Sequence, residues 1–189
     1  GDAYVDSVNV GMTDLVASLR WIQENIANFG GDPNKVMIYG QSGGGSKVTC
    51  LLGMPSASGM IHTAAVQSGG GGNSPAAEQS KELSRQLMKE LGLGPNDLAA
   101  LQKMEWSRLI AAGNATIAKI NPPVRGLTGP GSAPSATPRV GWGPTVDGKT
   151  VTLRSFFDAA PDVSKNIPVL IGSVSEEGMQ FHSQPTEAE

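Results

Sequence analysis

The pentapeptide Gly40-Gln41-Ser42-Gly43-Gly44 has the form G-x-S-x-G, which can present a serine as a nucleophile. The apolar run of residues 36–39 before it predicts a strand buried on both faces, and residues 46–52 after it predict a helix. A tight turn between them would strain the backbone of Ser42 and expose its hydroxyl. An incidental serine in a glycine-rich turn is the alternative, but the flanking strand and helix favour a nucleophile.

The other residues of this turn have predicted roles of their own. We expect glycine at positions 40 and 44 because side chains there would collide where strand and helix cross. The helix that follows would aim its first amides at the serine, since helix N-termini carry unsatisfied N–H groups and a positive dipole end. The N–H of Gly43 could then stabilise the oxyanion that forms when an acyl carbonyl is attacked.

A serine nucleophile needs a base, usually histidine, and neither histidine of this chain suits that role well. His62 begins a predicted strand, and we interpret it as a packing or hydrogen-bonding residue. His182 lies five residues after Glu177, close to the end of the chain. In proteins with this motif the base comes well after the acid. His182 therefore stays a weak candidate, and we assign no base within the chain.

The rest of the sequence predicts alternating helices and strands. The predicted helices cover residues 12–28, 78–91, 96–101 and 105–112, and the further predicted strands cover residues 63–67 and 167–171. Residues 121–144 hold six prolines and five glycines, which predicts a long loop. This order of elements predicts an α/β layer with parallel strands.

Composition excludes several classes of protein. The formal charge is −3 and the Lys and Arg residues are scattered, so we expect no nucleic-acid partner. The single Cys50 cannot form an internal disulfide, and no His/Cys cluster has metal-ligand spacing, so we expect no metal site. No apolar run reaches the ~18 to 20 residues of a transmembrane helix. Localisation and oligomeric state stay open.

The sequence resembles the type-B carboxylesterases and cholinesterases over nearly its whole length, most weakly between residues 76 and 139. The residues that carry the resemblance are the elbow Gly40 to Gly44 and the segments FGGDPNKV (29–36), LRWIQENI (19–26), AVQSG (65–69), PTVDG (144–148) and IPVLIG (167–172). The resemblance implies an α/β-hydrolase-type fold with a mostly parallel sheet and flanking helices. It also implies hydrolysis of small-molecule carboxylic esters through an acyl-enzyme, without a cofactor.

The same resemblance implies a triad acid in the turn Ser175-Glu176-Glu177-Gly178, where the family carries Asp-Glu-Gly. We assign Glu177, which would orient the histidine. Glu176 is the competing candidate, and a solvated acidic turn without catalytic role is the alternative to both.

Candidate substrate-binding residues are Gln41, Val140 and Trp142. Gln41 replaces the glutamate that many members carry before the serine, and Val140 and Trp142 fall near positions that line the acyl pocket, although a loop tryptophan often only covers a core. The family's glycine-rich oxyanion segment and its histidine have no counterpart in the chain. We therefore expect residues 1–189 to be the central portion of a longer, catalytic domain, and the chain alone to be a poor esterase with exposed apolar strands.

Two other functions stay open at this point. The family includes adhesion proteins that keep the fold without the chemistry, so the chain could belong to an inactive, esterase-like interaction domain. Another reaction of the same fold, such as that of a lipase or an amidase, is the second alternative. The intact Ser42 motif favours an enzyme.

Overall fold

The computed structural model describes residue 4 and residues 7–69, 74–121, 140–152 and 161–175. The predicted acid Glu177, its competitor Glu176 and the alternative base His182 lie outside the described residues. So does most of the predicted loop, from residue 122 to residue 139.

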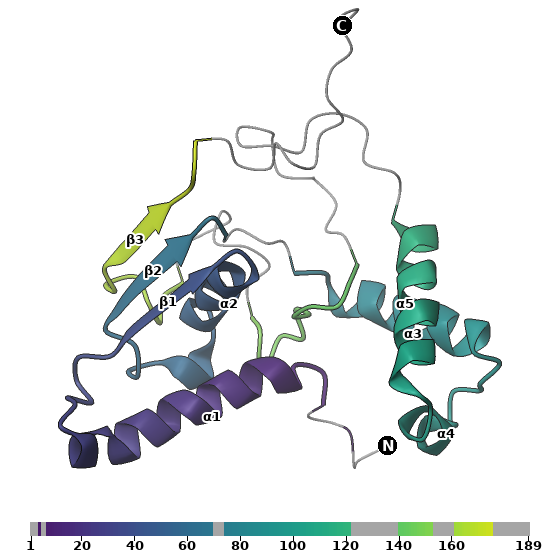
Figure 1. The fold of residues 1–189 in the computed structure, drawn as a ribbon, viewed down its shortest axis with the longest axis horizontal. Helices are drawn as coiled ribbons and strands as arrows, with labels where there is room; N and C mark the ends of the chain where they lie inside the picture. The colour runs from purple at the N-terminus through teal and green to yellow at the C-terminus, as the bar shows by residue number, and fades with distance from the viewer. Residues whose placement is uncertain (1–3, 5–6, 70–73, 122–139, 153–160, 176–189) are drawn as a thin grey trace, which may run out of the picture.

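The described sheet has three parallel strands, as the sequence predicts. Its strands are β1 (Met37–Gln41), β2 (Thr63–Gln67) and β3 (Val169–Gly172), in the order β1-β2-β3. Gln41 is paired with Gln67, and Gln67 with Gly172, so all three strands end at the same edge. Helix α2 (Gly43–Leu52) follows β1 directly and packs on β1 and β2 (Figure 1).

Helix α1 (Val10–Asn25) continues as the 3-10 helix η2 (Ile26–Phe29), which ends at Gly30 with a positive φ of 81°. A second short 3-10 helix, η3 (Pro55–Ala57), follows α2. The core lies between α1, α2 and one face of β2. It is lined by buried apolar residues, among them Met12, Val16, Leu19, Val48, Leu51, Leu52, Met54, Ala64 and Val66.

The expectation that residues 36–39 form a strand buried on both faces is wrong for β1, whereas Ala64, Ala65 and Val66 of β2 are all buried, as predicted for that strand. Tyr39 of β1 and Leu170 of β3 flank Ala65 in register, and their side chains are 74% and 72% exposed. Side chains alternate between the two faces of a strand, so these residues lie opposite the core face of Ala64 and Val66. The described helices pack on one face of the sheet, so the large side chains of the two outer strands on its other face stay exposed, while the small Ala65 between them is buried.

A second group of helices lies beside the sheet (Figure 1): α3 (Ala77–Glu90), α4 (Leu98–Gln102) and α5 (Trp106–Ile120), with α3 packed on α5. Helix α5 extends eight residues beyond the predicted end at residue 112. Gly113 lies in its interior, where glycine normally weakens a helix. Here the missing side chain makes room for Trp142, because an added Cβ would lie 2.1 Å from that indole.

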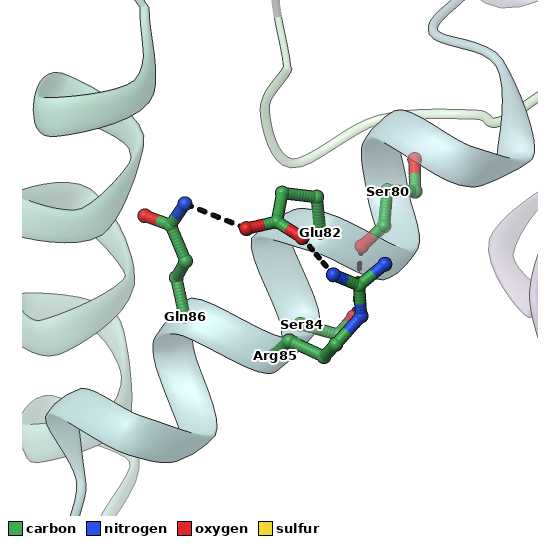
Figure 2. Close-up of polar contacts among 5 residues, drawn as sticks. All are labelled: Ser80, Glu82, Ser84, Arg85 and Gln86. Carbon is green, nitrogen blue, oxygen red and sulfur yellow. Dashed lines mark hydrogen bonds and ion pairs between the residues drawn. The ribbon is translucent and has the colours of Figure 1, made fainter.

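The polar side of α3 carries contacts within the helix (Figure 2). Glu82 accepts hydrogen bonds from Arg85 and Gln86, and the Ser84 hydroxyl donates to the carbonyl of Ser80 at 3.0 Å. Exposed pairs of this kind contribute only a few tenths of a kcal/mol, up to about 1 kcal/mol. This side of α3 is therefore a solvated surface with no feature of a reactive site.

Residues 140–152 run between the sheet and the α3–α5 group and connect them (Figure 1). The buried side chain of Asn9, just before α1, accepts the N–H of Thr145 at 2.9 Å and donates to the Thr145 carbonyl and the Asp147 carboxylate. The Thr145 hydroxyl also bonds Ser80 of α3 at 2.8 Å. These contacts bind α1, α3 and the connecting segment into one framework.

Candidate active site

Ser42 occupies the strained turn that the sequence predicts. Its φ of 53° and ψ of −119° lie outside the regions that non-glycine residues normally adopt, and it is the N-cap of α2. Backbone hydrogen bonds hold it on both sides: its N–H donates to the Gln67 carbonyl at 2.8 Å, and its carbonyl accepts the Ser46 N–H at 3.1 Å. The residue itself is exposed. The fold thus holds a reactive residue type rigidly at the carboxyl edge of the sheet.

Gly40 is required by the close crossing of β1 and α2. A Cβ built on it would lie 2.4 Å from the carbonyl carbon of Gly44 and 2.5 Å from its oxygen, distances that real Cβ atoms do not show. The same expectation is wrong for Gly44, because its own added Cβ would meet no described atom within 4 Å. The backbone of Gly44 therefore excludes a side chain at position 40. A side chain at position 44 would point into open space.

Two further residues that support the elbow follow β2: Ser68, which the resemblance implies to be a structural residue behind the site, and Gly69, to which the sequence interpretation gave no role at the elbow. A Cβ on Gly69 would lie 2.1 Å from the carbonyl oxygen of Ser42, so only glycine permits this approach. Ser68 before it has a positive φ of 47°, and its N–H donates to the Gly172 carbonyl at 2.8 Å. A signal in the sequence was the run of glycines after Ser68, which marks a backbone that must bend sharply or approach another backbone.

Gly43 is the first residue of α2, where amides have no acceptor within the helix. Its N–H therefore belongs to the group of amides that could hold an oxyanion next to Ser42. Lys47, one turn further along α2, donates from its ammonium to the Gly43 carbonyl at 3.2 Å. A positive charge thus lies one turn along the helix from the predicted oxyanion amide.

His62 has the structural role that the sequence interpretation gave it. Its Nδ1 accepts the Val36 N–H at 3.2 Å, and its own backbone N–H donates to the Val36 carbonyl at 2.9 Å. It precedes β2, whereas Ser42 bonds to the last residue of that strand. Five strand residues span about 16 Å, which places His62 at the wrong end of the sheet to act as the base.

The acid predicted from sequence lies just past the described part of the chain. β3 ends at Gly172, whose carbonyl accepts the Ser68 N–H, so residues 173–175 leave the sheet at the edge that holds Ser42. Glu177 follows two residues later. Its assignment as the triad acid stays a prediction.

The three predicted substrate-binding residues lie in two places. Gln41 ends β1 and is exposed beside Ser42. Val140 and Trp142 are held by α5: Val140 is buried and bonded to Asn121, and the Trp142 indole lies against Gly113. Their contact with a substrate stays a prediction.

Among the described residues, no group of three His, Cys, Asp or Glu side chains could hold a metal ion. Within the same residues, no helix combines the length and apolar character needed to cross a bilayer.

Cys50 lies on the buried side of α2. Its burial, and to a smaller extent the charge of Asp147, raises the pKa of the thiol to about 11. A thiol in this environment is not a competing nucleophile.

Comparison with known proteins agrees with this geometry. The model of the carboxylesterase family matches residues 6–189. The para-nitrobenzyl esterase of Bacillus subtilis (strain 168) is 31% identical over 192 residues, which cover 98% of this chain and 36% of the relative. The crystal structure of the Geobacillus stearothermophilus carboxylesterase EST55 superposes with a TM-score of 0.74 at 30% identity, covering 96% of this chain and 34% of that one.

A third similar protein is an esterase from Clostridium hathewayi described as able to hydrolyse aliphatic aromatic polyesters. It has a TM-score of 0.71 and 32% identity, and the match covers 100% of this chain and 36% of that one. The chain thus spans about a third of the length of these relatives. The expected α/β-hydrolase-type parallel sheet with flanking helices is confirmed by the solved esterases, of whose fold this chain covers only part. The chain belongs to the carboxylesterase family.

Proposed function

We propose that this segment hydrolyses carboxylic esters as part of a longer polypeptide, which we call the complete enzyme. The observation that carries the proposal is the backbone of Ser42, an exposed serine with a φ of 53° between β1 and α2. Such strain persists only where the surrounding structure enforces it, and it is concentrated at functional sites. Membership of the carboxylesterase family supports the same chemistry.

In the proposed reaction the Ser42 Oγ attacks the acyl carbon while a histidine outside the described residues takes the hydroxyl proton. The resulting oxyanion accepts a hydrogen bond from Gly43 N–H. The tetrahedral intermediate collapses when the alcohol leaves with the proton from the histidine. Water then attacks the acyl-enzyme, with the same histidine as base, and releases the carboxylic acid and free Ser42.

Glu177 is the proposed acid that orients this histidine. The support is its place two residues after the described part of the edge that holds Ser42. By analogy with other triads, Glu177→Gln in the complete enzyme should lower kcat by roughly 10³ to 10⁴ and leave the fold intact. Glu176→Gln should stay within about tenfold of wild type. If the two effects were exchanged, Glu176 would be the acid.

The decisive experiment treats the complete enzyme with a fluorophosphonate probe and maps the adduct by peptide mass spectrometry. We expect one stoichiometric adduct at Ser42, and loss of both labelling and ester turnover in Ser42→Ala. Ser84→Ala, which removes an exposed hydroxyl on α3, is the matched control and should label normally. An active enzyme that carries the adduct elsewhere would contradict the assignment of the nucleophile.

The proposed substrates are small-molecule esters. The similar proteins include a para-nitrobenzyl esterase and a carboxylesterase, which supports ester rather than amide cleavage. A matched pair of p-nitrophenyl ester and p-nitroanilide substrates with the same acyl group tests this choice. Faster turnover of the anilide would indicate an amidase of the same fold.

A further inference from the structure

Helix α2 begins with three backbone amides that have no hydrogen-bond acceptor in the described part of the chain. They belong to Gly43, Gly44 and Gly45, and the first N–H of the helix to find an acceptor is that of Ser46, which donates to the Ser42 carbonyl. A serine at the N-cap normally accepts one of these amides through its side chain. Ser42 occupies the N-cap without making this bond. The hydroxyl of the nucleophile and the amides beside it are thus not used up on each other.

Lys47 adds a charge to this end of the helix. Its Nζ donates to the Gly43 carbonyl at 3.2 Å and would lie 3.7 Å from a Cβ placed on Gly43. Standard bond lengths then put the ammonium within about 6 Å of the Gly43 nitrogen. The Gly43 carbonyl belongs to the same peptide unit as the N–H of Gly44. The ammonium therefore polarises one of the unpaired amides directly.

The charge of Lys47 has no carboxylate to balance it nearby. Between Lys35 and His62 it is the only charged side chain in the sequence. None of the ion pairs among the described residues includes it. A cation near a helix N-terminus weakens the helix, because that end of the helix dipole is already positive. A residue that breaks a local rule in this way is expected where function gains from it.

We propose that Lys47 is a positioning residue for ester hydrolysis, which holds the Gly43–Gly44 peptide and adds positive potential where the oxyanion forms. This inference rests on the proposed function, in which the Ser42 Oγ attacks the acyl carbon. As that bond forms, the electron pair of the carbonyl π bond moves onto the acyl oxygen, which becomes negative at the first amides of α2. An oxygen bonded to the Gly43 N–H lies less than about 10 Å from the ammonium. The charge attracts this anion more strongly than it attracts the neutral ester, so it accelerates the reaction.

The test measures kcat/KM of the complete enzyme for the neutral ester p-nitrophenyl butyrate. Lys47→Met keeps the apolar stem without the charge and should lower kcat/KM about three- to tenfold at low salt. Lys47→Arg keeps the charge and should stay within about twofold of wild type. The side chain of Lys47 is exposed, so salt can screen it. Between about 0.01 M and about 1 M salt the Debye length falls from about 30 Å to about 3 Å, and the difference between wild type and Lys47→Met should shrink to within about twofold.

Lys47→Glu separates this electrostatic role from a structural one. A carboxylate is favoured near a helix N-terminus, so the urea midpoint of unfolding should stay the same or rise. The value of kcat/KM should nevertheless fall further than in Lys47→Met, because the new charge repels the oxyanion. The matched control is Lys35→Met, which removes an exposed lysine just before β1 and should leave kcat/KM unchanged.

Two outcomes would overturn the role of Lys47 while ester hydrolysis by Ser42 stands. One is an unchanged kcat/KM at low salt in folded Lys47→Met. The other is a loss of activity in Lys47→Met and Lys47→Glu that follows a loss of stability and does not depend on salt. Absence of any Ser42-dependent turnover in the wild type would instead refute the proposed function itself.

Discussion

The two glycines of the G-x-S-x-G motif should respond differently to the same substitution. In Gly40→Ala, the new Cβ would lie 2.4 Å from the carbonyl carbon of Gly44, whereas ordinary contact begins at 3.4 Å. Both atoms belong to the backbone, so relief requires α2 to move away from β1 by the difference of 1.0 Å. Overpacking of this kind costs typically 1 to 3 kcal/mol, and we expect about 3 kcal/mol because no flexible side chain can yield.

Gly44→Ala is the matched variant within the same motif. The added methyl would meet no described atom within 4 Å. Gly44 lies in the first turn of α2, and alanine is favoured over glycine in a helix by up to about 1 kcal/mol. The two variants should therefore differ in stability by about 3 to 4 kcal/mol, although each adds a single methyl group.

The assay is urea unfolding of the complete enzyme, with fluorophosphonate labelling of Ser42 as a second readout. We expect Gly40→Ala to unfold at a much lower urea concentration and to label about 10²-fold more slowly, since a displacement of about 1 Å at a reacting group costs that much. Gly44→Ala should be as stable as wild type or slightly more stable. Equal losses of stability in the two variants, or a loss below about 0.5 kcal/mol in Gly40→Ala, would refute this account of the elbow.

Three further predictions concern the framework around the site. Asn9→Ala breaks three hydrogen bonds of a buried amide and should lower the free energy of unfolding, measured in urea, by about 2 to 3 kcal/mol. The control Asn25→Ala removes one exposed hydrogen bond and should lower it by less than about 1 kcal/mol. Partial burial raises the pKa of Asp147, but backbone N–H bonds and the Asn9 amide outweigh it and lower the pKa overall. The stability that the Asp147 carboxylate contributes is full above the unfolded pKa of about 3.9 and is lost as pH falls through the lower folded pKa. Asp147→Asn should therefore flatten the acid limb of the pH–stability curve measured by urea unfolding. Cys50, with its pKa raised to about 11, should react with iodoacetamide at pH 8 roughly 10²-fold more slowly in the native protein than in denaturant.

Local features of the fold could be predicted from sequence because each depends on neighbouring residues. The strand, turn and helix around Ser42 follow from an apolar run, a glycine motif and a helix-forming run within 17 residues, 36–52. The buried stripe of α1 follows from apolar residues at helical spacing, and Met12, Val16 and Leu19 are indeed buried. In both cases the pattern and its structural consequence lie in the same stretch of chain.

Features that depend on distant residues could not be predicted. Whether Tyr39 is buried depends on whether other helices pack on the second face of the sheet. The apolar pattern of the strand does not specify this, and in the structure Tyr39 is exposed. Helix α5 passes through Gly113 because Trp142, 29 residues later, replaces the missing side chain. The bond between Asn9 and Thr145 joins residues 136 positions apart. A single sequence carries no marker for partners at such separations.

The G-x-S-x-G motif alone does not hold Ser42 in its strained conformation. A backbone like that of Ser42 costs about 1 to 3 kcal/mol, so another part of the structure must enforce it. Part of this enforcement comes from α2, through the Ser46 N–H, and part comes from β2, through the Gln67 carbonyl and the bare backbone of Gly69. Gln67 and Gly69 lie outside the pentapeptide, and β2 is itself bound to β3, which leads toward Glu177. The position of the nucleophile is therefore a property of the whole parallel sheet, and the reactivity of Ser42 depends on the packing that keeps these strands together.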